Sequence, residues 1–266
     1  MGFEKFRNLE INGGQVTPIP TKAGGIKLEI PPISESKLYT DAQIDDYGGL
    51  PRAQYPWHPR ENETVDLRLT ATFSHTVAHL IGTAGFGFWN APFGDPTVPW
   101  PALPQAVWFF FGSPPNDLPL NPQGEGNRFF AGTLDAGTGR ALALAPLAPF
   151  VVGLNHFSPF RQRVWPRIQS QLGISFASIG SNIDITQPHR YRLLWHQNGA
   201  SFEIDGHEIL VTEQSPRGPL GFVCWIDNQY MRVTPTGRLA VGTLKTQERQ
   251  SLFIQDFSLK LFKNRV

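Results

Sequence analysis

Cysteine is almost missing from this chain of 266 residues, which contains only Cys224. One cysteine excludes an internal disulfide, and its place in an apolar segment favours a small buried side chain over a nucleophile. A reducing compartment is therefore favoured. Residues 1–6 contain no apolar signal segment, so we expect a cytoplasmic protein unless an export signal has been removed.

Charge is also scarce. Charged residues make up 17% of the chain, the net charge is +1, and no stripe of Lys and Arg is visible. A surface that follows nucleic-acid phosphates needs concentrated positive charge, so nucleic acid is not an expected partner. No apolar run approaches the ~18–20 residues of a membrane span, so we expect no membrane-spanning helix.

Glycine and proline are abundant, at 26 and 24 residues, and are spread over the whole chain. This is typical of many short strands joined by tight turns. Residues 65–73 alternate apolar and polar side chains, which predicts a half-buried strand. The sequence therefore predicts an all-β sandwich of two antiparallel sheets, forming a single domain over 1–266 with an N-terminal extension and first strands in 1–37. Further strands are expected at 26–30, 38–47, 84–90, 106–111, 129–134, 191–196, 201–211, 220–227, 238–244 and 252–262.

One segment, 158–172, departs from the strand pattern. Ser158 is a candidate helix cap with Pro159 in the first helical position, and apolar residues recur every four positions after it. Pro166 should kink or shorten the helix. The segment is either a short helix docked on the sandwich, a mobile lid over a ligand site, or a surface or membrane contact.

The last quarter of the chain contains three motifs in a characteristic order: residues 191–196 ending in Trp195-His196, the hairpin segment 201–209 with Ile204-Asp205-Gly206, and residues 218–228 with Trp225. Together they resemble the closing strands of the concanavalin A-like lectin/glucanase superfamily, in particular glycoside hydrolase family sixteen. The resemblance implies a jelly-roll sandwich with a ligand cleft on its concave sheet.

The catalytic signature of that family is missing. The family has three carboxylates on the strand after an "x-F-W" strand, whereas here Phe88-Trp89 is followed by the aromatic segment 106–112 without a carboxylate. Retaining hydrolysis needs two carboxyl groups about 5–5.5 Å apart, so the usual mechanism of the family is not expected. Glu203 and Asp205 are close in sequence, but Asp205-Gly206 predicts a hairpin turn.

Three tryptophans are the best candidates for ligand contact. Trp89, Trp108 and Trp225 belong to three strands that would cross the cleft, and indole faces stack well on sugar rings or flat apolar molecules. Core packing explains any one of them equally well. If Trp225 binds the ligand, Trp225→Ala should weaken affinity with little change in thermal midpoint. Candidate hydrogen-bonding partners beside them are Asn90, Asp227, Asn228 and Gln229.

A second candidate cluster lies in 38–47, whose alternation puts Tyr39, Asp41, Gln43 and Asp45 on one face. A solvated outer face is the default interpretation, but such residues also suit a polar ligand or a calcium ion. Asp41 and Asp45 are about 13 Å apart along a strand, so an acid/base pair would have to combine one of them with Asp227.

The leading hypothesis is thus a ligand-binding protein for a glycan or a ring-bearing small molecule. The alternative is a divergent enzyme, either glycoside-active or catalysing proton transfer or cyclisation of an apolar substrate, with Asp45, Asp227 and His156 as candidate acids and bases. A purely structural or oligomerisation module comes third. No cofactor is expected beyond possible calcium, and His75 and His79 lack the glutamate of a zinc-protease motif. Oligomeric state remains open.

Overall fold

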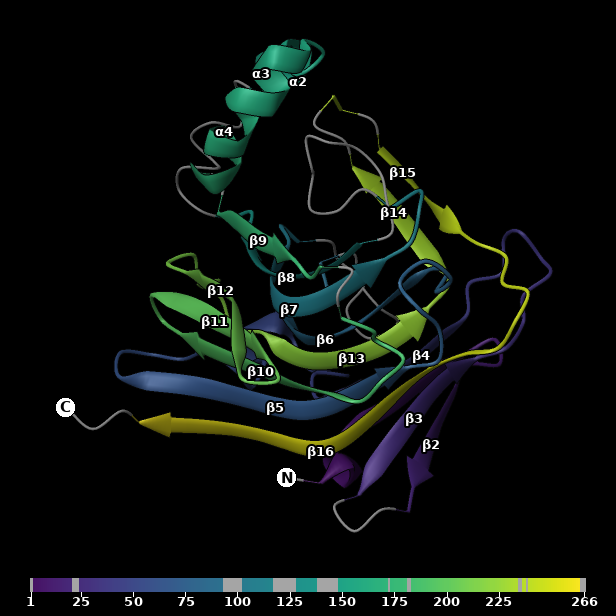
Figure 1. The fold of residues 1–266 in the computed structure, drawn as a ribbon. Helices are drawn as coiled ribbons and strands as arrows, with labels where there is room; N and C mark the ends of the chain where they lie inside the picture. Colours follow the sequence, from purple (N-terminus) through teal and green to yellow (C-terminus); the bar gives the residue numbers. More distant parts are fainter. Residues whose placement is uncertain are drawn as a thin grey trace.

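The computed structural model describes residues 2–20, 24–92, 102–116, 128–137, 148–171, 173–180, 183–233, 236–237 and 239–263. They form two antiparallel seven-stranded sheets and a separate two-stranded hairpin (Figure 1). This confirms the predicted all-β sandwich with a minor helical insertion. No helix in these ranges has the length and apolar character needed to cross a membrane.

The first sheet has the strand order β1-β4-β13-β6-β7-β8-β9. Its strands are β1 (Arg7–Ile11), β4 (Asp41–Asp45), β13 (Gly221–Asp227), β6 (Thr83–Trp89), β7 (Gln105–Gly112), β8 (Arg128–Asp135) and β9 (Ile174–Ser178).

The second sheet has the order β12-β11-β10-β5-β16-β3-β2. Its strands are β12 (His207–Thr212), β11 (Gly199–Ile204), β10 (His189–His196), β5 (Glu63–Phe73), β16 (Gln250–Lys263), β3 (Gly25–Ile30) and β2 (Gln15–Ile19). The separate hairpin consists of β14 (Gln229–Val233) and β15 (Leu239–Thr243), and two 3-10 turns lie at Phe3–Lys5 (η1) and Arg52–Gln54 (η2).

The core lies between the two sheets and follows from period-two alternation. On β5, Val65, Leu67 and Leu69 point inward and are at most 2% exposed. Aromatic side chains of the first sheet, such as Phe86 and Phe109, belong to the same buried cluster, which extends from Phe6 to Leu259. Cys224 is a free, buried thiol in this cluster, as predicted, and its burial raises its pKa.

The predicted hairpin turn is also confirmed. Asp205 and Gly206 both have positive φ, 53° and 79°, and they join β11 to β12. Positive φ at both central residues defines a type I′ turn, whose twist matches that of the two strands. Asp205 is therefore a turn residue.

Three short helices form an arm between β8 and β9: α2 (Ala148–Leu154), α3 (Ser158–Arg163) and α4 (Trp165–Gln171). The predicted helix is present but is broken after Arg163, and Pro166 is the second residue of α4. The cap prediction is wrong, because Phe157 is the N-cap of α3 and Ser158 is already helical. The helix α2 was not predicted.

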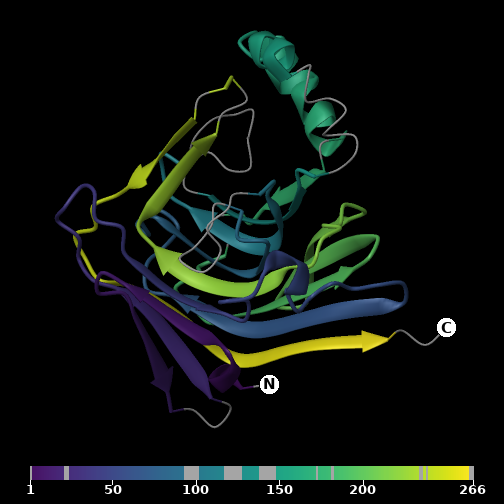
Figure 2. The same cartoon turned by 180° about the vertical axis from the view of Figure 1, so that it is seen from behind.

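The arm stands apart from the two sheets and meets the β14–β15 hairpin at its far end (Figures 1 and 2). A Cβ atom built on Gly237, in the hairpin turn, would lie 2.8 Å from Cγ1 of Val152 on α2. Glycine therefore permits a close approach between these two segments. Both rise on the concave side of the first sheet, where β13 curves toward them (Figure 2).

Candidate functional site: an aromatic face beside a carboxyl pair

The outer face of the first sheet is the face that points away from the second sheet. On β6, Phe86 and Phe88 point into the core, so Gly85, Gly87 and Trp89 point to the outer face. The same alternation on β13 places Trp225 and Asp227 on the outer face, as predicted. The three predicted strands are neighbours in the order β13-β6-β7.

Six aromatic side chains pack together on this face and are called the aromatic floor. Trp225 lies at the centre of the floor and is 7% exposed, while Trp89 and Trp108 are half-buried. Ring centroids of Trp108 and Trp225 are 5.6 Å apart, and Trp89 and Trp225 have parallel rings at 6.3 Å. The floor thus brings the three predicted tryptophans together. Its full set is Trp89, Trp108, Phe110, Phe130, Phe176 and Trp225.

Two glycines make room for the floor. A Cβ atom on Gly85 would lie 2.9 Å from Cη2 of Trp225, because the indole lies over the Gly85 backbone. Gly87 has φ +150°, and a Cβ atom there would lie 2.5 Å from the Val107 carbonyl oxygen. Both positions therefore require glycine, and the alternating Gly-Phe-Gly-Phe-Trp sequence of β6 separates the inner face, packed on the core, from the outer face that carries the floor.

A tyrosine pair borders the floor. Trp89 Nε1 donates a 2.7 Å hydrogen bond to Tyr47 Oη, and Gln43 Nε2 donates to the same oxygen at 3.3 Å. The rings of Tyr47 and Tyr55 pack with centroids 4.9 Å apart. Gln43 and Tyr47 are buried, so the prediction of a solvated outer face for 38–47 is wrong.

Two carboxyl groups lie next to the floor. Asp41 on β4 is directly opposite Asp227 on β13, and the residues are 1% and 4% exposed. Oδ1 of Asp227 accepts hydrogen bonds from Thr83 Oγ1 at 2.8 Å and from the backbone N–H groups of Thr83 and Gln229 at 3.1 and 3.0 Å. Trp225 Nε1 donates to Thr83 Oγ1 at 2.9 Å, which links the pair to the floor.

Burial controls the protonation of this pair. Desolvation raises the pKa of Asp227 to about 7, and desolvation together with the charge of Asp227 raises the pKa of Asp41 well above its usual value. Tyr39 forms a side-chain hydrogen bond with Asp41, and its own pKa is raised by burial and by this neighbour. Asp41 Oδ1 is buried without a hydrogen-bond partner among the described residues. Near neutral pH the pair therefore holds a proton.

Asp45 is held in a structural ion pair. It is fully buried, and its Oδ2 accepts from Arg7 Nη2 at 2.7 Å and from Gln43 Nε2 at 3.0 Å. Its Oδ1 accepts from the Gly48 N–H at 2.8 Å. These contacts hold the carboxyl group in a fixed position within the fold.

The predicted amides also make internal bonds. Asn228 accepts from the Thr40 N–H and donates to the carbonyls of Leu38 and Leu244. Asn90 donates to the Leu103 carbonyl and accepts from the Gln105 N–H. These two side chains connect loops. Gln229 is half-buried at the start of β14, and its N–H bonds Asp227.

His156 is remote from the carboxyl pair. It is exposed in the turn between α2 and α3, with Nδ1 3.1 Å from the Val152 carbonyl oxygen. No hydrogen bond or ion pair among the described residues joins it to Asp41 or Asp227. The structure does not bring together the three predicted acid and base residues.

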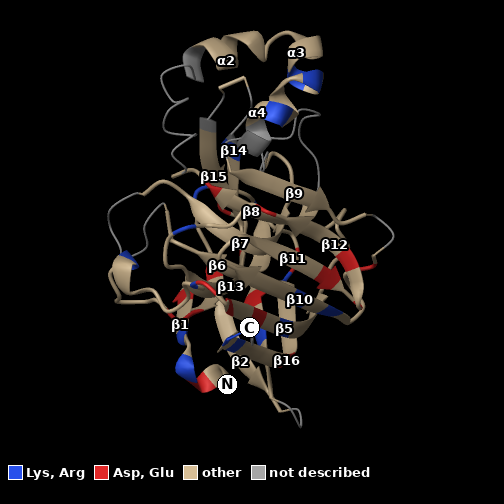
Figure 3. Ribbon diagram, turned by 90° about the vertical axis from the view of Figure 1, so that its left-hand side faces the viewer, with Lys and Arg blue, Asp and Glu red and all other residues tan. Residues whose placement is uncertain are grey.

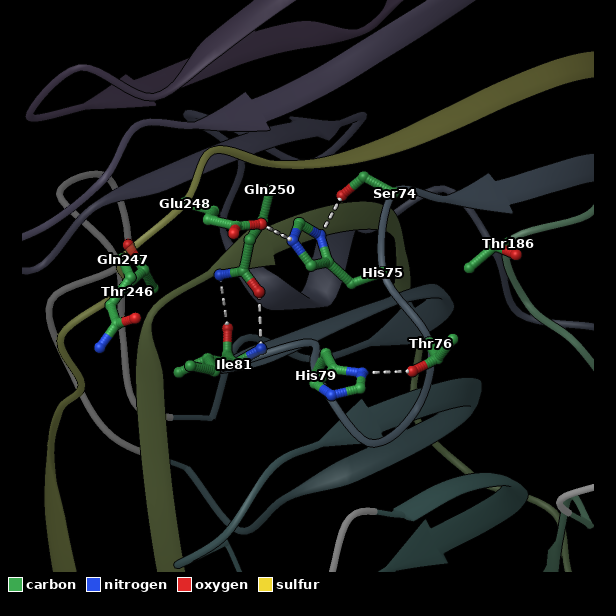
Figure 4. Close-up of a pocket in the computed structure, with 10 residues that line it drawn as sticks. All are labelled: Ser74, His75, Thr76, His79, Ile81, Thr186, Thr246, Gln247, Glu248 and Gln250. Atoms are coloured by element: carbon green, nitrogen blue, oxygen red, sulfur yellow. Dashed lines mark hydrogen bonds and ion pairs between the residues drawn. The ribbon is translucent and has the colours of Figure 1, made fainter.

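A pocket of about 460 Å³ lies elsewhere, between the β5–β6 loop and the segment that precedes β16 (Figure 4). Its lining includes Ser74 Oγ 2.7 Å from His75 Nδ1, and His75 Nε2 3.1 Å from Glu248 Oε2. These are the residue types of a hydrolase triad. However, the Ser74 oxygen also accepts from the Ser251 N–H, and the Glu248 side chain is 79% exposed, so the ring is not oriented by a buried acid. We assign this polar pocket no reaction.

Within the described ranges, no group of three or more His, Cys, Asp and Glu side chains could hold a metal ion. Calcium takes six to eight oxygen ligands. The Asp41–Asp227 pair offers two carboxylates, which adds no support for the calcium site considered from the sequence.

No protein-family model matches this chain, and no curated protein matches its sequence. Among solved structures, alginate lyase AlyC3 in complex with dimannuronate is similar with a TM-score of 0.44 and 9% identity, over 92% of this chain and 77% of that one. The polysaccharide lyase family 18 protein aly-SJ02 is similar with a TM-score of 0.46 and 6% identity, over 94% of this chain and 95% of that one. The binding domain of botulinum neurotoxin DC in complex with SialylT is similar with a TM-score of 0.42 and 8% identity, over 98% of this chain and 44% of that one. The finer resemblance to glycoside hydrolase family sixteen stays a prediction.

Proposed function

We propose that the protein binds a small, ring-bearing apolar ligand on the aromatic floor. The observation that supports this proposal is the position of Trp89 and Trp108, half-buried on the sheet face that does not pack against the second sheet. Flat apolar rings stack on indole faces, with an energy beyond that of area burial alone. Trp225 forms the base on which these two indoles pack.

An apolar ligand is favoured over a glycan because the predicted amide partners, Asn90 and Asn228, are already engaged. Asn90, Asn228 and Asp45 make internal hydrogen bonds, as described above. A glycan hydroxyl that displaced water without gaining a partner would lose affinity. In this proposal Asn90 and Asn228 support the site instead of contacting the ligand, and specificity comes from the shape of the floor.

The experiment is calorimetric titration with two panels, oligosaccharides and polycyclic apolar compounds, on the protein and on Trp108→Leu. We expect saturable binding of an apolar compound, weakened about tenfold or more in the variant. The matched control is Phe262→Leu, which changes an exposed aromatic residue on β16. Unchanged affinity in Trp108→Leu, or binding of oligosaccharides alone, would overturn the proposal.

A second candidate is a proton-transfer enzyme on the same face. It is favoured by the buried, proton-holding Asp41–Asp227 pair, linked through Thr83 to Trp225. A carboxyl group with its pKa near 7 can act as a general acid or base at neutral pH. Mass spectrometry of each bound compound after incubation tests for conversion. A product that is formed by the protein and by His156→Gln but not by Asp227→Asn, with binding retained in all three, would favour the enzyme.

A further inference from the structure

The helical arm is cationic and contains no carboxylate. Between Asp135 and Asp184 the sequence has no Asp or Glu. The described helices contain Arg161, Arg163 and Arg167, and Figure 3 shows the basic residues of α3 and α4 without an acidic neighbour on the arm. This local charge differs from that of the whole chain, whose net charge is +1.

The arm also exposes large apolar side chains. Phe150 is 67% exposed, Phe157 64% and Val164 37%. Single exposed apolar residues are common on soluble proteins. Two phenylalanines that are this exposed and lie in the same cationic segment instead indicate a contact surface. The three residues follow one another at intervals of seven: Phe150 lies within α2, and Phe157 and Val164 cap the two ends of α3.

The position of the arm makes these residues accessible. α2 and α3 lie at the end of the molecule opposite β2 and β3, and away from both sheets (Figures 1 and 2). α4 contacts β9 at the base of the arm, and α2 meets the hairpin at Gly237. Phe150 and Phe157 are therefore exposed on a part of the molecule that stands away from both sheets.

We propose that this arm docks on an anionic lipid surface. Phe150 and Phe157 insert among the upper acyl chains, while Arg161, Arg163 and Arg167 contact lipid phosphates at the level of the headgroups. Guanidinium groups pair with phosphate through planar, bidentate hydrogen bonds. Apolar side chains beside basic ones are the signature of an element that lies in a membrane interface.

A lipid surface is favoured over an acidic protein partner because the aromatic side chains protrude. A protein interface buries its aromatic anchors in preformed pockets within a wide complementary patch. Protruding side chains on short helices insert into a fluid layer without a shaped receptor. Such binding is reversible and interfacial, and it is independent of whether the aromatic floor binds a ligand.

The test is flotation of the protein with vesicles of phosphatidylcholine alone and of phosphatidylcholine mixed with phosphatidylglycerol. We expect binding to the mixed vesicles, little binding to the neutral ones, and a decrease as salt screens the phosphate contacts. The double variant Phe150→Ser, Phe157→Ser should bind about tenfold or more weakly even at low salt. Arg163→Gln should weaken binding to the mixed vesicles and reduce its dependence on salt.

Two matched variants serve as controls. Leu261→Ser with Phe262→Ser removes two exposed, though less exposed, apolar side chains from β16, and Arg60→Gln removes an exposed charge far from the arm in sequence. Both should bind like the unaltered protein. Near-ultraviolet circular dichroism checks folding, which exposed side chains should not alter.

Three outcomes would overturn the proposal. These are absence of binding to mixed vesicles, binding that is unchanged in the Phe150→Ser, Phe157→Ser variant, and equal binding to neutral vesicles. Self-association that the same double substitution abolishes, without vesicle binding, would assign the arm to a protein contact instead.

Discussion

Asp41 and Asp227 face each other across β4 and β13, with both carboxyl groups withdrawn from water. Cross-strand neighbours have Cβ atoms about 4.5–5.5 Å apart, so two negative charges at this position would repel strongly. The proton that the pair holds is therefore part of the folded structure, and stability must depend on pH.

Stability should fall as pH rises from about 4 to about 7. Asp227 titrates at about 7 in the folded protein and near 3.9 when unfolded, so the folded state binds more protons throughout this window. Below the unfolded pKa the Asp227 carboxyl is protonated in both states, so its burial carries no charge penalty. Above pH 7 the folded protein holds a buried negative charge, and the whole penalty acts against folding.

Asp227→Asn should flatten this dependence, because an amide has no proton to lose and its oxygen still accepts from Thr83 and Gln229. Urea unfolding at pH 5 and pH 8 measures the effect. Asp184→Asn is the control, since Asp184 is exposed and its pKa is lowered by Thr186. An equal change in the free energy of unfolding between pH 5 and pH 8 for the protein and for Asp227→Asn would contradict the interpretation.

Trp225→Ala should destabilise the fold by about 3–5 kcal/mol. The indole is 7% exposed, packs against Trp89, Trp108 and Phe110, and loses its bond to Thr83 on truncation. This prediction differs from the sequence-based expectation of a nearly unchanged thermal midpoint, because the indole is buried. Thermal unfolding followed by circular dichroism is the measurement, and a midpoint within a degree or so of the original would show that the floor tolerates the cavity.

Gly87→Ala should cost about 2–5 kcal/mol, through its φ of +150° and the close Val107 carbonyl. Gly153→Ala is the matched comparison. Gly153 lies in α2, and no atom lies within 4 Å of the position that a Cβ atom would take there. Alanine at this position should stabilise by about 0.5–1 kcal/mol by favouring the helix. Chemical denaturation of both variants checks the opposite signs.

Arg7→Gln should cost about 3–5 kcal/mol, because it leaves the Asp45 carboxylate buried with its charge uncompensated. Adding Asp45→Asn should recover most of the loss. Arg68→Gln provides the contrast, since Arg68 is 54% exposed and Arg192 still pairs with Asp66. Its cost should stay below about 1 kcal/mol. Equal losses in the two single variants would refute a special role for Arg7.

Local pattern was sufficient to predict much of the fold. The alternation in 65–73 identified β5, and Asp205-Gly206 identified the hairpin turn. First strands were expected within 1–37, with bounds for 26–30 only, and the structure places β1, β2 and β3 there, whereas β9 and β14 were not predicted. The helix α2 has a continuous apolar sequence, which indicates no helical face.

The candidate site was predicted only in part. Side chains two residues apart on a strand point to the same face, which already placed Trp225 and Asp227 together. The same rule places Phe110 beside Trp108, but the sequence-based prediction did not include Phe110. Phe130 and Phe176 join the floor through pairing of β8 with β7 and β9, which no local pattern specifies. The burial of 38–47 was missed because alternation distinguishes the two faces of a strand but does not say what covers them.

The place of β16 has a consequence for synthesis of the protein. Residues 250–263 lie in the interior of the second sheet, between β5 and β3 (Figure 1). A nascent chain on the ribosome therefore exposes two strand edges, on β3 and β5, that have no partner until residue 263 has emerged. Unpaired edges of this kind recruit other chains. The interval between translation of β5 and of β16 is therefore the period in which these two edges are open to pairing with other chains.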